Sequence, residues 1–288
     1  MRTFWVVIFI FFSTFLHAED SAGAYVCEKT DTGARLSRDG QTFWEFCADS
    51  PEGKPFVHPI ALPDGRVVTD LRPDDHVWHM GLWFCWKYVN GVNYWEPADA
   101  ERIRPAGETH VRDWDVEITS ENAAVVRMTL VYRPRETPEK VVMTEKRRIE
   151  FSAPDEMGNY TITSRHHFEI GTEDVELERT PPHARGGGYA GLGLRLNNQC
   201  SDFVVTCSNG GTDMPSIRAA DASWVDYRDA KTGLGIRFTV LRGTPQTRFY
   251  AQKSANYCFV NPCPVHESAL RLPAGGELDL EYEIRIGK

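Results

Sequence analysis

Apolar and polar residues alternate along most of the chain after residue 120, in segments that Gly, Pro, Asp and Asn separate. A period of two, bounded by turn residues, indicates half-buried β-strands. The segments with this pattern are AAVVRMTLVYRP, KVVMTEKRRIEFSA, NYTITSRHHFEI, GYAGLGLRLN, DFVVTCSNG, GLGIRFTVLRG and ELDLEYEIRIG. No apolar stripe with the 3.6-residue period of a helix extends over about a dozen residues. We therefore predict an all-β fold, a large antiparallel β-sandwich with few short helices.

Turn residues predict three hairpins. A Gly-bearing turn joins two alternating runs in YRDAKTGLGIRF and again in LRLPAGGELDLEY. In WKYVNGVNYWE the pair Asn90-Gly91 stands between aromatic and β-branched residues, which is the strongest short hairpin pattern. The segment before it therefore divides into a loop, DDHVWHM, and a strand, GLWFCWKYV, that turns back at Asn90-Gly91.

The loop DDHVWHM holds Asp75, His76 and His79, where side chains from a loop and a strand end can converge. Imidazole both accepts and donates a proton near neutral pH, and a neighbouring carboxylate fixes its tautomer. Three interpretations stay open: a structural turn, general acid–base chemistry or substrate hydrogen bonding, and metal ligation through H-x-x-H. The metal hypothesis needs a third ligand from elsewhere, and the candidates are Glu145, His166, His167 and His183.

The strand GLWFCWKYV is aromatic on both of its predicted faces. Trp83, Cys85 and Lys87 share one face, and Phe84, Trp86 and Tyr88 share the other. At least one of these faces is expected in the core, because aromatic side chains bury large areas in β-sandwiches. The other face could stack on a sugar ring through Trp83 or Trp86, while Arg147 or Arg195 holds a hydroxyl or a uronate.

The first 18 residues have the features of a secretory signal peptide. One arginine precedes an apolar run from Phe4 to Leu16, and Ala18 stands before acidic residues. The run is shorter than the roughly 20 residues that span a membrane. We predict cleavage after Ala18, a secreted or periplasmic location and no stable membrane span afterwards. No linker or repeat divides residues 19–288, which predicts a single domain.

Charge and cysteine content refine this picture. The formal net charge is −9 at pH 7, and loss of Arg2 with the leader makes it one unit more negative, which argues against a nucleic-acid partner. All seven cysteines follow the leader, where disulfides can persist. Cys200/Cys207, Cys258/Cys263 and Cys27/Cys47 are the expected pairs, with Cys85 as a buried thiol. The chain carries no G-x-S-x-G, H-E-x-x-H, P-loop or dinucleotide motif.

Several segments resemble the secreted bacterial family labelled methane oxygenase PmoA-like, a domain of unknown function. They are HPIALPDGRVVTDLRPDDHVWHMGLWFCWKYVNGVNYWE, YAGLGLRL, WVDYRDAKTGLGIRF and FVNPCPVHESALRLPAGGELDLEYEIRI, of which DHVWHMGLWF is the most specific. The resemblance implies a fold like the galactose-mutarotase supersandwich. It carries over the positions Asp75, His76, His79 and Gly81 as motif residues. A subunit of the membrane-bound methane oxygenase is an integral membrane protein, so methane oxidation is not expected for a chain without a spanning segment.

The leading hypothesis is an exported carbohydrate-active protein that binds a sugar or glycan on a concave sheet face. In it His76 and His79 are acid–base or orienting groups and Asp75 orients one imidazole. Trp83 or Trp86 would stack on the ring, and Arg147 or Arg195 would hold a polar group. Epimerase, lyase and hydrolase chemistry all fit. The alternatives are a non-catalytic glycan-binding or structural module and a metal-dependent enzyme using His76 and His79. Sequence assigns no cofactor, no metal and no oligomeric state.

Overall fold

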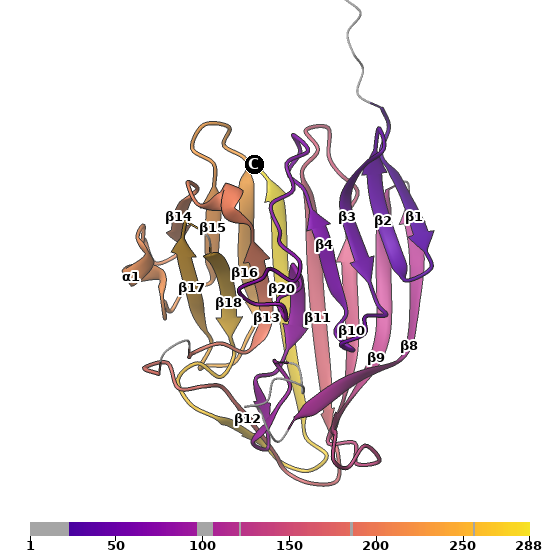
Figure 1. Cartoon of the computed structure of the whole chain (residues 1–288), viewed down its shortest axis with the longest axis vertical. Coiled ribbons are helices and arrows are strands. Elements are labelled where there is room, and N and C mark those ends of the chain that lie inside the picture. Colours follow the sequence, from indigo (N-terminus) through magenta and orange to yellow (C-terminus); the bar gives the residue numbers. More distant parts are fainter. Residues whose placement is uncertain (1–22, 97–105, 121, 185–186, 256) are drawn as a thin grey trace, which may run out of the picture.

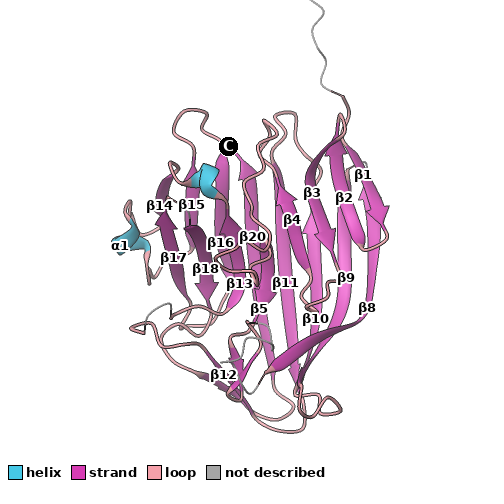
Figure 2. Cartoon of the chain, viewed as in Figure 1, coloured by secondary structure: helices cyan, strands magenta, loops and turns pink. Residues whose placement is uncertain are grey.

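Two eight-stranded antiparallel sheets form the body of the structure (Figures 1 and 2). The computed structural model describes residues 23–96, 106–120, 122–184, 187–255 and 257–288. The predicted leader and its cleavage site lie outside the described residues. The first sheet consists, in spatial order, of β1 (Val26–Thr30), β2 (Gly33–Arg38), β3 (Gln41–Cys47), β4 (Phe56–Ile60), β5 (Leu82–Cys85), β13 (Gly191–Leu196), β18 (Tyr257–Cys263) and β17 (Arg248–Ser254).

The second sheet contains the longest strands. Its order is β14 (Val204–Cys207), β15 (Trp224–Arg228), β16 (Gly235–Arg242), β20 (Glu277–Gly287), β11 (Tyr160–Ile170), β10 (Met143–Phe151), β9 (Ala123–Pro134) and β8 (Gly107–Ser120). A small third sheet lies at one end of the sandwich, in the order β19 (Leu270–Leu272), β12 (Val175–Glu178), β6 (Tyr88–Val89) and β7 (Val92–Asn93). In the described part of the chain the helical segments are α1 (Met214–Ile217) and the 3₁₀ turn Asn198–Cys200. The predicted all-β sandwich with few short helices is confirmed.

The core lies between the two large sheets, where inward-facing residues of alternating strands meet. Trp44 of β3 stacks on Phe151 of β10 with ring centroids 4.0 Å apart, and Phe84 of β5 lies 5.5 Å from Phe168 of β11. On β10 and β11 every second side chain is buried, which is the pattern that the sequence showed. Phe84 therefore lies on the inner face of β5, and Trp83 lies on its outer face.

Two of the predicted hairpins form and one does not. β15 pairs with β16, and β6 pairs with β7 across Asn90 and Gly91, whose positive φ angles of 52° and 74° suit a tight hairpin turn. The hairpin predicted in LRLPAGGELDLEY is wrong. β19 pairs with β12 in the small sheet, whereas β20 pairs with β11 and β16 in the second large sheet.

The strand predicted over GLWFCWKYV is interrupted. β5 ends at Cys85 in the first large sheet, and β6 begins at Tyr88 in the small sheet. Trp86 and Lys87 thus carry the chain from the first large sheet to the small sheet, which places the hairpin β6–β7 outside the main sandwich.

All seven cysteines are free thiols, so the expected pairs do not form. Cys258 and Cys263 stand at opposite ends of one strand, five residues and so about 16 Å apart, well beyond disulfide reach. Cys27 and Cys47 lie on β1 and β3, which β2 separates. Cys85 is buried, as predicted. The described residues include no helix long and apolar enough to cross a membrane.

Candidate functional site

The loop from Arg72 to His79 projects from the outer face of the first sheet. Leu71 and Met80 form an antiparallel bridge at its base, and the Arg72 amide donates to the His79 carbonyl at 2.8 Å. Inside the loop, the amide of His76 donates to the Pro73 carbonyl and the amide of His79 to the His76 carbonyl, each at 2.9 Å. These two successive tight turns bring both imidazoles to the same side, as the turn-forming Pro-Asp-Asp sequence predicted.

Gly81 fixes the path of the chain out of the loop. Its φ is +65°, and a Cβ atom there would lie 2.5 Å from the Val57 carbonyl oxygen of β4. Any larger residue would push the loop off the sheet. The histidines therefore depend on this glycine for their place above β5.

Asp75 connects a buried arginine to a half-exposed histidine. Arg195 of β13 donates from one guanidinium nitrogen to both Asp75 carboxylate oxygens, at 2.8 and 2.9 Å. The second oxygen lies 3.0 Å from Nδ1 of His76. The Asp75 and His76 side chains are 44% and 35% exposed, and that of Arg195 is 2% exposed. Burial alone would raise the pKa of Asp75, but hydrogen bonds from Arg195 and His76 hold that pKa below its ordinary value.

His79 lies beneath His76 and is almost completely buried. Its ring is stacked 4.6 Å from His76 and 5.0 Å from Phe259 of β18, and it lies 5.0 Å from Trp83. Burial first, and then the nearby positive charges of Arg195 and Lys54 together with any charge on His76, lower its pKa to about 2. His79 is thus neutral near pH 7, with one ring nitrogen protonated and the other able to accept a hydrogen bond. Its Nδ1 has no hydrogen-bond partner among the described residues.

Aromatic residues of β5 and β18 form the floor under the two histidines. Phe259 and Trp83 approach to 5.9 Å across Gly193 of β13, where a Cβ would meet both rings at 3.1 and 3.3 Å. Tyr257 lies 5.1 Å from His76, and the Arg195 guanidinium covers the Tyr257 ring at 4.2 Å. Stacking and cation–π contact hold these groups in one layer.

The structure brings together five of the seven residues that sequence singled out. Asp75, His76, His79, Trp83 and Arg195 form the loop cluster. Trp86 does not join it, because it points to the opposite face and packs on Phe84 and Phe168 at 5.4 and 5.5 Å.

Arg147 lies elsewhere too, inside the sandwich on β10. It donates to Glu145 at 2.6 and 2.9 Å, while Nδ1 of His166 lies 2.7 Å from the same carboxylate and the Tyr132 hydroxyl donates to it at 2.6 Å. All four residues are buried. Both Glu145 and Arg147 point inward, so Arg147 does not hold a sugar group at the loop cluster. We call Glu145, Arg147 and His166 the core cluster.

The candidate metal ligands are spread over the molecule. Glu145 and His166 lie in the core cluster, whereas His167 faces outward on β11 and pairs with Asp279. Among the described residues, no group of three or more His, Cys, Asp or Glu side chains is placed to hold a metal ion.

A cleft of about 430 Å³ opens beside the loop cluster. Val77 and Trp78 of the loop form one wall, and Trp78 also lies 5.4 Å from His76. The other walls carry the charged residues Glu52, Lys54, Arg72, Glu96, Glu108 and Arg135. Trp78 thus borders both the cleft and His76.

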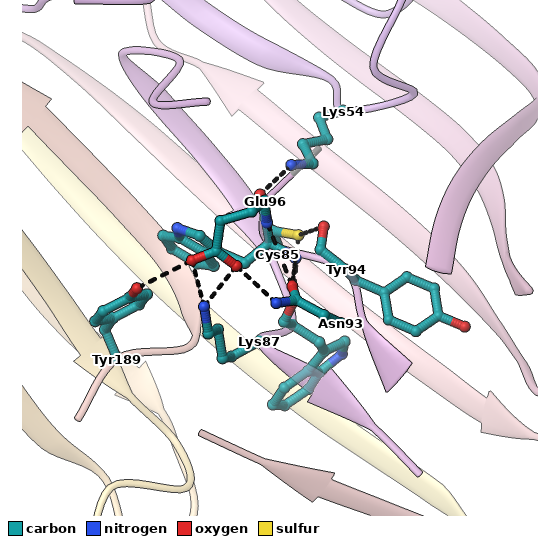
Figure 3. Close-up of polar contacts among 9 residues, drawn as sticks. Lys54, Cys85, Lys87, Asn93, Tyr94, Glu96 and Tyr189 are labelled. Atoms are coloured by element: carbon teal, nitrogen blue, oxygen red, sulfur yellow. Dashed lines mark hydrogen bonds and ion pairs between the residues drawn. The ribbon is translucent and has the colours of Figure 1, made fainter. Parts of the chain in front are cut away.

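The polar network around Glu96 borders this cleft (Figure 3). The Lys87 ammonium donates to both Glu96 oxygens, Asn93 donates to one of them at 2.8 Å, and the Tyr189 hydroxyl donates to the other at 3.4 Å. Lys54 donates to the Trp95 carbonyl. Figure 3 shows the Lys54 side chain reaching this network from the opposite side to Lys87.

Residues 33–287 match one protein family over nearly the whole described chain. The chain belongs to the family of unknown function DUF6807. The expected membership of a domain of unknown function is confirmed, while the name methane oxygenase PmoA-like is not part of this family's description. None of the curated proteins matches the chain.

Solved structures with similarity to the chain include two α-galactosidases. That of Lactobacillus brevis is 10% identical with a TM-score of 0.45, and the match covers 92% of this chain and 39% of the enzyme. A variant GH36 α-galactosidase of Geobacillus stearothermophilus in complex with stachyose is 10% identical with a TM-score of 0.40, and the match covers 92% of this chain and 39% of the enzyme. The Slr1438 protein of Synechocystis sp. PCC 6803 is 8% identical with a TM-score of 0.45, and the match covers 92% of this chain and 96% of that protein. The chain thus spans about two fifths of either galactosidase, and similarity this distant carries no argument about its activity.

Sequence reasoning missed several residues of the site. Tyr257 and Phe259 alternate on β18, so the period-two pattern of YCF could have placed them on one face. Lys54 lies in a loop between β3 and β4, and no local pattern points to it. Its position depends on contacts with Trp95, which is 41 residues away in the sequence.

Proposed function

We propose that this chain is an exported carbohydrate-active protein that binds a sugar or glycan in the cleft beside the loop cluster. One observation carries the proposal: Asp75 links the buried Arg195 to the half-exposed His76, next to a cleft with an aromatic wall. Aromatic rings suit the apolar face of a sugar ring, and charged or amide groups suit its hydroxyls. Trp78 and the charged walls of the cleft provide both.

In this proposal His76 is the proton-transfer group. The Asp75 carboxylate, 3.0 Å from Nδ1 of His76, orients the ring and leaves Nε2 to exchange a proton with a sugar that extends from the cleft past Trp78. Arg195 keeps Asp75 ionised and oriented. His79 supports the His76 ring by stacking and stays neutral. An epimerase, a lyase and a hydrolase each need a proton-transfer group, and identifying the ligand and its product would distinguish among these three activities.

A second candidate is a glycan-binding module without catalysis. The burial and low pKa of His79 favour it, because the loop then offers one proton-carrying imidazole rather than two. Both candidates predict sugar binding in the same cleft, and they differ in what loss of His76 does.

The test compares His76→Gln with His167→Gln. His167 is a matched control, since its side chain is 32% exposed and its Nδ1 lies 2.8 Å from Asp279 on the far face of the second sheet. Thermal melts against a panel of mono- and oligosaccharides identify a ligand. Product analysis and deuterium uptake from D₂O into that sugar then report turnover.

We expect the wild type and His167→Gln to turn the ligand over, and His76→Gln to bind it without turnover. Binding without turnover in the wild type would instead establish the glycan-binding module. Absence of any sugar shift in the wild type would contradict both candidates.

A further inference from the structure

Each carboxylate that lines the cleft is paired with a cation, but among the described residues not every cation is paired with a carboxylate. Glu52 accepts two hydrogen bonds from Arg72 at 2.8 and 3.0 Å, and Glu96 is paired with Lys87. Glu108 accepts a hydrogen bond from Arg133 at 2.6 Å, and Arg135 approaches it at 3.6 Å. Each carboxylate of the cleft therefore has a cation of its own.

Lys54 is the cation left over. It is 6% exposed, and its ammonium donates to the Trp95 carbonyl. No carboxylate forms an ion pair with it in the part of the chain that the structure describes. An ammonium group has three donors, so two remain after the bond to Trp95. Burying a charge without a counter-charge is costly, which makes this an unusual position for a lysine with a structural role alone.

The field of Lys54 reaches the loop cluster as well. It is among the positive charges that lower the pKa of His79, and it lowers that of Cys85 against the larger effect of burial. The lining of the cleft carries three carboxylates and three cations, and Lys87 and Arg133, which pair with two of these carboxylates, raise the cations to five. Counted with these partners, the site is locally positive in a chain whose formal net charge is −9. A local excess of positive charge in a negatively charged protein favours an anionic ligand at that place.

We propose that the cleft binds an anionic sugar, whose carboxylate or sulfate oxygen pairs with the Lys54 ammonium. The proposal rests on the proposed function, because it names the class of sugar that the same cleft would take. Both groups offer oxygens that accept charge-assisted hydrogen bonds from an ammonium. Trp78 would contact the sugar ring while Lys54 holds the charged end.

The experiment is isothermal titration with matched trisaccharides of glucose, galactose and mannose, each in neutral, uronic-acid and sulfated form. The proteins are the wild type, Lys54→Met and Lys253→Met. Lys253 is the matched control, since its ammonium also donates to a backbone carbonyl, that of Phe203, and no carboxylate pairs with it among the described residues. It lies on β17, outside the cleft.

We expect an anionic trisaccharide to bind the wild type and Lys253→Met about tenfold more tightly than its neutral counterpart, as one charge-assisted contact implies. In Lys54→Met this preference should disappear, with neutral binding changed by less than about twofold. Whether the uronate or the sulfate binds more tightly tells which group the cleft takes.

The experiment distinguishes failure of the Lys54 assignment from failure of sugar binding. An anionic preference that survives in Lys54→Met, or tighter binding of the neutral sugars, would overturn the assignment of Lys54 and leave sugar binding intact. No binding of any trisaccharide would overturn the proposed function as well. If Lys54→Met does not fold, the salt dependence of the wild type decides: added salt must weaken anionic binding and spare neutral binding.

Discussion

The molecule contains two clusters with the same three kinds of residue in different surroundings. The loop cluster joins Asp75, His76 and Arg195, and the core cluster joins Glu145, His166 and Arg147. In the core cluster all three side chains are 2% exposed or less, whereas in the loop cluster the acid and the histidine are 44% and 35% exposed. The two clusters contain the same ionisable groups, and their exposure to solvent distinguishes a buried structural network from a site that a ligand can reach.

The core cluster stabilises the sandwich. Burial alone would raise the pKa of Glu145, yet the Arg147 charge and hydrogen bonds from His166 and Arg147 lower it well below its ordinary value. Burial lowers the pKa of His166 to about 4, although Glu145 opposes this. A neutral imidazole and a paired carboxylate with no room for a ligand suit a structural network. The loop cluster has the same groups beside a cleft.

The largest expected effect is that of Glu145→Gln. The variant leaves the buried Arg147 without its counter-charge, which should lower the free energy of unfolding by about 3–5 kcal/mol in urea denaturation. Glu150→Gln is the control on the same strand, because its carboxylate is 34% exposed and pairs with Arg148 and Arg165 at the surface. It should cost less than about 1 kcal/mol. Equal losses in the two variants would contradict the distinction between buried and exposed pairs.

The next effect is a loss of stability as the pH falls from 7 to 5. His79 and His166 have folded-state pKa values of about 2 and about 4, below the ordinary 6.5. Below pH 6.5 the unfolded chain takes up protons that the folded chain does not. The free energy of unfolding therefore falls with decreasing pH, by up to about 1.4 kcal/mol per pH unit for each histidine. Denaturation at several pH values measures the slope.

His166→Gln and His79→Phe each sharpen that test. Removing one of these histidines should flatten the slope by up to one proton between pH 6.5 and 5, while His58 and His266, whose pKa values burial also lowers, keep their share of it. A slope that neither substitution changes would mean that other groups cause it.

A smaller loss of stability than that of Glu145→Gln is expected for Asp75→Asn, at about 1 kcal/mol, because water can reach a carboxylate that is 44% exposed even though its partner Arg195 is buried. Asp279→Asn is closely matched, since Asp279 is 46% exposed and pairs with His167 and Arg242 at 2.8 Å each. Asp279→Asn should be at least as stable as Asp75→Asn, because its partner Arg242 is 62% exposed whereas Arg195 is buried, and Asp75→Asn alone should lose turnover of the sugar ligand. Loss of turnover in both, or in neither, would argue against the loop cluster as the site.

The sequence predicted much of the fold because apolar and polar residues alternate along the long strands, most regularly on β10 and β11. β9, β10, β11 and β20 each coincide with an alternating segment. Where strands are short or buried on both sides, the alternation fails. The turn residues of LPAGG predict a hairpin, but β19 is too short for its pattern to show which strand it pairs with, and β19 and β20 belong to different sheets.

The candidate site could be predicted only in part. The turn-forming Pro73-Asp74-Asp75 and the aromatic strand after it are adjacent in the sequence, so their convergence was visible. Arg195, His166 and Arg147 could not be told apart by local pattern, since all lie on strands and the pairing of distant strands decides which face each one occupies. Lys54 shows the same limit, because its environment depends on Trp95 and on the packing of two loops.

The most direct test of a sugar site in this cleft is a crystal structure of the protein soaked with the sugar that gives the largest thermal shift. We expect sugar density in the cleft, with one ring against Trp78, a polar group within hydrogen-bond distance of the Lys54 ammonium, and Nε2 of His76 facing the ligand. Sugar bound elsewhere, for example on the charged outer face of the second sheet around His167, would contradict this expectation.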